Sequence, residues 1–157
     1  MRASFPGSPS VFTALAVLPP LTLAGCSSGG PPEGEDSGSG GGQVFSLPGG
    51  VSLLVSGPVD GASDSSVPGT VAVVGDCIGV KIGDNSYVVV WPTGTTAGEG
   101  GDPGIVLPDG VEVALGSEIE GGGGFTAPAD LPATAPELPG SCSDAEQIAV
   151  LDTVNVP

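Results

Sequence analysis

The clearest structural signal in this chain lies in one stretch, which reads Asp76-Cys77-Ile78-Gly79-Val80-Lys81-Ile82-Gly83-Asp84-Asn85-Ser86-Tyr87-Val88-Val89-Val90-Trp91-Pro92. Apolar side chains occupy every second position from Ile78 to Ile82, which is typical of a strand with one apolar face. Residues 83–85 tolerate the positive φ angles of a tight turn, and residues 87–91 form a second, β-branched run. The stretch therefore predicts a β-hairpin that ends at Pro92.

Further short apolar runs, bounded by Gly, Pro and Asp, predict strands on both sides of this hairpin. They are residues 44–47, 51–55, 70–74, 105–107, 111–115, 118–120 and 148–156. The turn Pro108-Asp109-Gly110 predicts a second hairpin between 105–107 and 111–115. Because no long amphipathic helix pattern is present, we predict an all-β fold. This is a small closed or partly open barrel of the OB-like type, or a compact sandwich.

The connections between these strands are rich in Gly, Pro and Ser. Residues 57–69 and 95–103 are predicted to be loops. The run Gly121–Gly124 is predicted to be a flexible or tightly turning connection. It is not read as a phosphate cradle, because no P-loop sequence accompanies it. Residues 127–140 contain too many prolines for a helix or a central strand, and one helical turn is expected at 143–147.

Two interpretations of Trp91, the only tryptophan, follow from its place at the end of a predicted strand. As a core or core-edge residue it fills the interior of the domain. As an exposed residue it stacks on a bound ligand.

The N-terminal segment contains Leu23-Ala24-Gly25-Cys26, which resembles a bacterial lipobox. Arg2 and the apolar run 11–18 fit the remainder of a signal peptide over residues 1–25, whereas Pro19-Pro20 interrupts any membrane-spanning helix. A plain secretory signal is the main alternative. The resemblance implies a diacylated, palmitate-bearing Cys26 and a protein anchored on the extracytoplasmic face of the cell membrane. Residues 26–42 then form a flexible tether rich in Gly, Ser and acidic residues, and residues 43–157 form the domain.

Charge and composition exclude several classes of function. The chain has 2 Lys and Arg residues against 18 Asp and Glu, a net charge of -16, and no histidine. Such a surface cannot neutralise nucleic-acid phosphates or dock on anionic lipid headgroups. Without histidine, Ser–His and Cys–His nucleophile pairs and histidine-based zinc sites cannot form. We therefore expect no enzymatic activity and no cofactor, and partners that are cationic or neutral.

The chain contains three cysteines. If Cys26 carries lipid, Cys77 and Cys142 remain, and an even remainder in an exported chain predicts one disulfide. The alternative is a metal site with two thiolate ligands, but such a site lacks the usual close Cys spacing and further Cys or His ligands.

Several local motifs resemble a small extracytoplasmic β-barrel module of lipoproteins and secreted proteins in high-GC bacteria. They are Gly75-Asp76-Cys77-Ile78, Val90-Trp91-Pro92-Thr93-Gly94, Asp109-Gly110, residues 113–116, Gly122-Gly123-Gly124 and Cys142. The resemblance implies a closed barrel with a bridge between Cys77 and Cys142. It implies no particular activity.

Three functional hypotheses remain. The first is a non-catalytic surface lipoprotein that binds an envelope protein or glycan through its barrel. The second is a divalent-cation (calcium) module that uses the oxygen ligands of Asp102, Asp109 and Glu112, or of Asp84 with Asn85. The third is a hydrolase with a carboxylate pair drawn from Glu112, Glu118 and Glu120.

Overall fold

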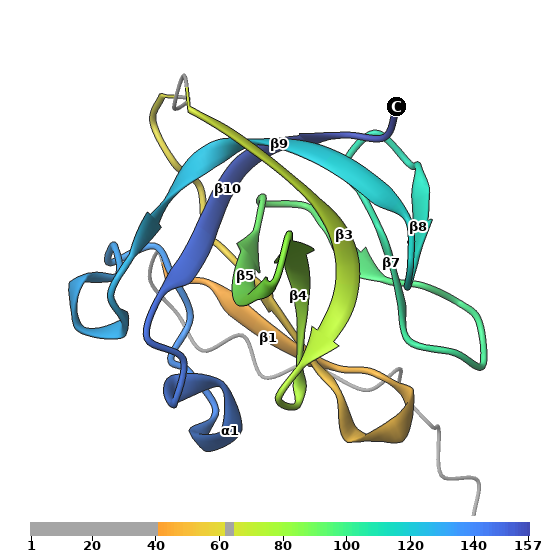
Figure 1. Cartoon of the computed structure of the whole chain (residues 1–157), viewed down its shortest axis with the longest axis horizontal. Helices are drawn as coiled ribbons and strands as arrows, with labels where there is room; N and C mark the ends of the chain where they lie inside the picture. The colour runs from red at the N-terminus through yellow and green to blue at the C-terminus, as the bar shows by residue number, and fades with distance from the viewer. Residues whose placement is uncertain (1–40, 62–64) are drawn as a thin grey trace, which may run out of the picture. The chain divides into compact units, whose positions relative to one another are not determined.

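The computed structural model describes residues 41–61 and 65–157, which form an all-β structure (Figure 1). This confirms the predicted fold class. The predicted signal peptide of residues 1–25, the lipidation site Cys26 and nearly all of the predicted tether lie outside the described residues. The first strand begins at Gln43, the first residue of the predicted domain.

Ten strands and three short helices follow one another along the described residues. The strands are β1 (Gln43–Ser46), β2 (Ser52–Val55), β3 (Ser66–Val74), β4 (Cys77–Ile82), β5 (Asn85–Trp91), β6 (Thr96–Ala97), β7 (Gly104–Val106), β8 (Glu112–Ala114), β9 (Glu118–Thr126) and β10 (Ile148–Asn155). The helices are the 3-10 turns η1 (Pro48–Gly50) and η2 (Pro128–Asp130), and α1 (Gly140–Ser143). Within the described ranges, none of the helices has the length and apolarity needed to cross a bilayer.

Both predicted hairpins are confirmed. Strands β4 and β5 are antiparallel, with Ile82 opposite Asn85 and Gly79 opposite Val88. Gly83 makes the turn possible, because its φ of 61° lies in the left-handed region that favours glycine. Strands β7 and β8 are likewise antiparallel, and Ile105 lies opposite Val113.

Five strands pair in a circuit that forms an OB-like barrel. The long strand β3 pairs with β9 through its first half and with β4 through its second half, both in antiparallel fashion. Strand β9 is antiparallel to β10, which in turn runs parallel to β5. The β4–β5 hairpin completes the circuit, and Figure 1 shows β3, β9 and β10 curving past this hairpin. The structure thus takes the partly open barrel among the predicted alternatives.

The barrel is irregular because its central hairpin opens at one end. Pairing of β4 with β5 stops at Gly79 and Val88, short of Cys77 and Trp91. Strand β2 occupies the opening and runs parallel to both neighbours, with Ser52 opposite Cys77 and Val55 opposite Trp91. Strand β1 then pairs with the other side of β2.

The two faces of the hairpin bury different apolar clusters, as alternation along a strand requires. The interior cluster contains Ile78, Val80, Val89 and Trp91, and the small sheet β6–β7–β8 adds Ile105 and Val113 to it. The outer cluster contains Cys77, Val88 and Val90.

The glycine run contradicts the predicted turning connection, because β9 continues without interruption through Gly121–Gly124. Close packing of β10 against β9 explains why glycine occupies two of these positions. A Cβ at Gly123 would collide with the Val150 carbonyl oxygen, and one at Gly121 would lie 2.9 Å from Leu151 Cδ2. Gly121 and Gly123 therefore allow the neighbouring strand β10 to approach β9 closely.

Three other boundaries differ from prediction. Strand β3 begins at Ser66, inside the predicted loop of residues 57–69. Strand β6 takes two residues of the predicted loop 95–103, because they pair with β7. The helical turn is α1, which begins three residues earlier than the predicted 143–147 and overlaps it only at Ser143. It follows Pro139, where a helix start tolerates the loss of an N–H.

Candidate functional site

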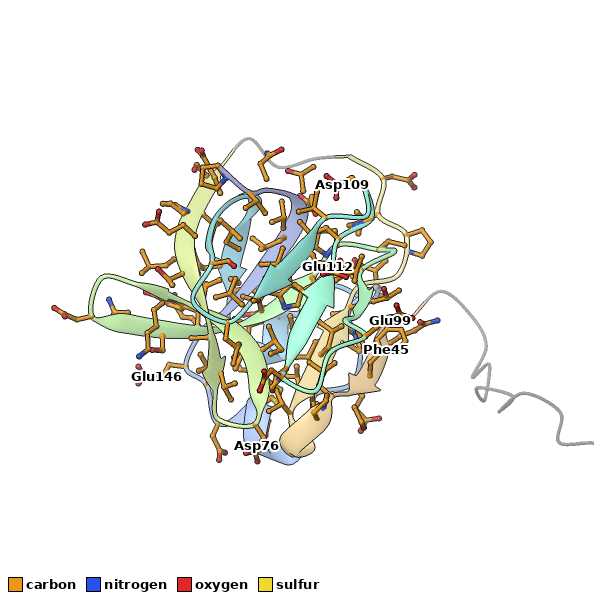
Figure 2. The ribbon with its side chains drawn as sticks, turned by 90° about the vertical axis from the view of Figure 1, so that its right-hand side faces the viewer. Phe45, Asp76, Glu99, Asp109, Glu112 and Glu146 are labelled. Atoms are coloured by element: carbon orange, nitrogen blue, oxygen red, sulfur yellow. A yellow bond between two sulfur atoms is a disulfide. The ribbon has the colours of Figure 1, made fainter. Side chains whose placement is uncertain are left out.

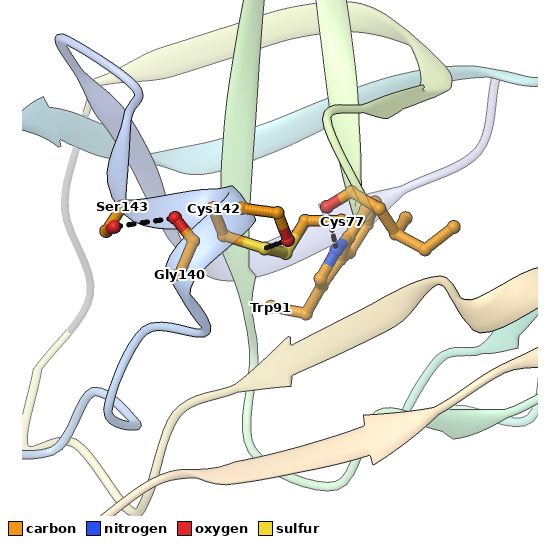
Figure 3. Close-up of a disulfide and its surroundings, with 7 residues drawn as sticks. Cys77, Trp91, Gly140, Cys142 and Ser143 are labelled. Atoms are coloured by element: carbon orange, nitrogen blue, oxygen red, sulfur yellow. Dashed lines mark hydrogen bonds between the residues drawn. A yellow bond between two sulfur atoms is a disulfide. The ribbon is translucent and has the colours of Figure 1, made fainter.

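A disulfide joins Cys77, at the start of β4, to Cys142 in α1 (Figure 3). Both cysteines are fully buried, and their Cα atoms lie 6.0 Å apart across a sequence separation of 65 residues. The predicted disulfide is thus present, and the metal-thiolate alternative is excluded because the sulfur atoms are bonded to each other. Next to the bridge, Ser143 Oγ donates a hydrogen bond of 2.7 Å to the Gly140 carbonyl and closes the turn of α1.

The disulfide fastens residues 127–147, which we call the strap, over the outer face of the hairpin. Apolar side chains of the strap, namely Leu131, Ala135 and Leu138, pack against the outer cluster around Val88 and Val90. In OB-like barrels the second and third strands of the circuit commonly carry the ligand face. Here those strands are β4 and β5, and the chain itself covers them.

Trp91 belongs to the interior of the domain. Its side chain has 0% exposure, and its Nε1 donates a hydrogen bond of 3.4 Å to the Ile78 carbonyl. This burial leaves no ring face on which a ligand can stack, so the core interpretation is the one that the structure supports.

Two of the three residues in the predicted cation site share a pocket. Asp102 and Glu112 line a concavity of about 200 Å³ together with Glu99, between the β6–β7 loop and β8. Asp109 does not line this pocket. Its carboxylate accepts a 3.2 Å hydrogen bond from the Val111 backbone N–H and caps the turn between β7 and β8. Figure 2 shows Glu99, Asp109 and Glu112 on the same side of the ribbon.

The described part of the chain contains no group of three or more His, Cys, Asp or Glu side chains arranged to hold a metal ion. The structure therefore gives no geometric support to a cation centre built from Asp102, Asp109 and Glu112.

The glutamates proposed for hydrolysis fall on two different surfaces. Glu118 and Glu120 point to solvent from β9 and line a second depression of about 430 Å³ that also contains Lys81. Glu120 accepts a hydrogen bond of 3.1 Å from Ser66 Oγ. Glu112 lines the first pocket, so it does not face either of the other two.

Two features of this region are not evident from sequence reasoning. Glu99 joins the pocket because β6 returns the chain to β7, and a two-residue strand has no periodic signal of its own. The second feature is the side of β8 that faces away from β7, which can be identified only when the pairing of the strands is known.

Comparison with protein-family models, curated proteins and solved structures gave no match.

Proposed function

We propose that this chain is a lipid-anchored extracytoplasmic protein whose β domain is a non-catalytic binding module for another envelope component. The observation that carries the proposal is the Cys77–Cys142 disulfide. Disulfides persist in oxidising compartments outside the cytosol. Because the chain has three cysteines, this bridge leaves Cys26 as the one thiol available for lipid.

The lipobox-like sequence before Cys26 supports the anchor itself. One acyl chain gives marginal membrane binding, whereas two give stable attachment. A diacylated Cys26 followed by the tether of residues 26–42 would hold the domain at the membrane while leaving its surface accessible.

The residue types and their placement support a binding role over catalysis. The sequence has no histidine, and Lys81 is the one cation in residues 43–157. Glu112 lies in a different pocket from Glu118 and Glu120, so no pair that includes Glu112 can flank one bond, as a glycosidase requires. Glu118 and Glu120 share a depression with Lys81, and Glu120 accepts a hydrogen bond from Ser66 Oγ.

The anchor is tested by expressing the full chain in a bacterium that processes lipoproteins. Mass spectrometry of the N-terminal peptide should find a diacylglycerol thioether on Cys26 and no residues before it. The intact protein should partition into the detergent phase of a Triton X-114 separation. The variant Cys26→Ala should lose both properties and keep the Cys77–Cys142 disulfide.

An intact leader, or an unmodified Cys26 in membrane fractions, would refute the anchor. The non-catalytic role is tested separately with a panel of glycoside and peptide substrates. Turnover that disappears in Glu112→Gln or Glu118→Gln would refute that part of the proposal.

A further inference from the structure

Strand β8 has one side to which no other strand is paired among the described residues. The sheet order is β6-β7-β8, so β8 is its outer strand. The Leu107 N–H donates to the Val111 carbonyl at 2.9 Å, and Ile105 lies opposite Val113. In an antiparallel pair the backbone groups of alternate residues point to the same side. The backbone groups of Val111 and Val113 therefore point toward β7. Those of Glu112 and Ala114 point to the opposite side of β8, which we call the open side.

The open side offers donors and an acceptor to an added strand. The Ala114 carbonyl already accepts a 3.2 Å hydrogen bond from the Ser117 N–H. The Glu112 N–H, the Glu112 carbonyl and the Ala114 N–H are then left for a partner backbone. The flanking residues Val111 and Leu115 are 39% and 40% exposed, so apolar contacts are available at both ends of the strand.

The acidic pocket adjoins this strand, because Glu112, Val113 and Ala114 are among its lining residues. It is lined by Gly104, Ile105, Val113 and Ala114 and by the exposed acidic residues Glu99, Asp102 and Glu112, which we call its rim. No cation of the domain neutralises this rim, since Lys81 lines the other depression. The carboxylates are also not arranged to hold one metal ion within the described structure.

A long basic side chain matches this combination better than a metal ion does. The aliphatic stem of a lysine or arginine packs on an apolar floor while its charged head remains among carboxylates and water. A peptide backbone that pairs with a sheet edge gains affinity from main-chain hydrogen bonds and specificity from the pockets beside it.

We infer that the open side of β8 and the acidic pocket dock an extended basic peptide segment of another extracytoplasmic protein. The segment pairs with Glu112 and Ala114, and one of its Lys or Arg side chains enters the pocket. This inference rests on the proposed function for the location of the partner. A second copy of this chain is a poor occupant, because two chains of net charge -16 repel each other.

Binding is tested with the full mature chain, purified in detergent, and a synthetic peptide of sequence Lys-Val-Lys-Val-Lys. The controls are Glu-Val-Glu-Val-Glu, spermidine and calcium chloride. Affinity is measured by calorimetry, and amide chemical shifts locate the contact. The basic peptide should bind and shift the amides of Glu112 and Ala114, and each control should bind at least about tenfold more weakly.

Two triple variants with the same change in net charge distinguish the effect of the pocket carboxylates from the effect of the protein's overall negative charge. Glu99→Gln, Asp102→Asn and Glu112→Gln together should weaken binding about tenfold or more. The control combines Asp84→Asn, Glu118→Gln and Glu137→Gln, which changes the net charge equally at exposed sites outside the pocket lining. It should change affinity by less than about twofold, because well-separated surface charges are largely screened at physiological salt.

A third variant, Ala114→Pro, removes an open-side N–H without altering charge, and an edge strand tolerates proline at such a position. It should also weaken peptide binding, with an unchanged disulfide and far-UV spectrum as evidence of folding. Equal losses in both triple variants, shifts that map away from β8, peptide-independent dimers or no binding at all would overturn the inference. Cys26 lipidation is measured on the same preparation. A lipidated protein that does not bind the peptide would refute the docking site without refuting the proposed lipid anchor.

Discussion

At the scale of single residues, Gly123 and Gly124 are neighbours on β9 with opposite tolerance for a side chain. A Cβ on Gly123 would collide with the Val150 carbonyl oxygen and lie 2.9 Å from Leu151 Cα, whereas a Cβ on Gly124 meets nothing within 4 Å. The two glycines therefore have different reasons to be there. The first allows β10 to approach, and the second has no packing constraint.

We predict that Gly123→Ala lowers the free energy of unfolding by about 1–3 kcal/mol, the usual cost of forcing extra atoms into a packed region. Gly124→Ala is the matched control and should change it by less than about 0.5 kcal/mol. Urea denaturation of both variants measures the difference. Equal stability of the two variants would contradict the contact between β9 and β10 at Val150.

At the scale of elements, strands with an alternating pattern could be predicted from sequence. Strands that depend on pairing with a segment distant in sequence could not. Alternation from Ile78 to Ile82 is a local signal, so the β4–β5 hairpin follows from sequence. Glycines have no side chains to alternate, so the path of β9 through Gly121–Gly124 depends on β10, which is distant in sequence. The prolines of the strap indicate a surface segment, but do not show that it covers the hairpin.

The candidate site was likewise predictable only where the signal in the sequence is local. Asp102 and Glu112 are identifiable from sequence as exposed oxygen ligands, and the structure brings both to one pocket. Asp109 looks equivalent in sequence, but its carboxylate is used by the turn that it caps. The open side of β8 has no local sequence signal, because it is defined by the lack of a second pairing partner for β8 among the described strands.

Besides the disulfide, a few apolar contacts and a 2.7 Å hydrogen bond from the Gly57 N–H to the Thr134 carbonyl hold the strap on the barrel. We predict that Cys77→Ala with Cys142→Ala lowers the free energy of unfolding by about 2–5 kcal/mol. The pair should also increase binding of a hydrophobic dye, since Val88 and Val90 lose part of their cover. Thermal and urea unfolding measure the first effect. Cys26→Ala is the control and should leave the domain's stability unchanged.

At the scale of the whole molecule, the barrel and the small sheet share one interior. Ile105 and Val113 of the small sheet belong to the same buried cluster as Trp91 and Val89 of the barrel. An element that contributes to a common core should unfold with it, because its loss exposes the apolar surface of its neighbours.

We therefore predict one cooperative unfolding transition. Fluorescence of Trp91, which is fully buried in the native state, should shift to the red at the same urea concentration at which the far-UV signal is lost. An amide of β8, followed by NMR, should report the same midpoint. An earlier transition at β8 alone would contradict the shared core.

The parallel pairing of β10 with β5 also sets an order of events during synthesis. The ribosome releases the chain from its N-terminus, so the β4–β5 hairpin has all its residues long before Ile148–Val150 emerge. Contacts between segments so distant in sequence form late and slowly. Until then the nascent polypeptide lacks the strand that completes the barrel, so β5 and β9 have no β10 to pair with.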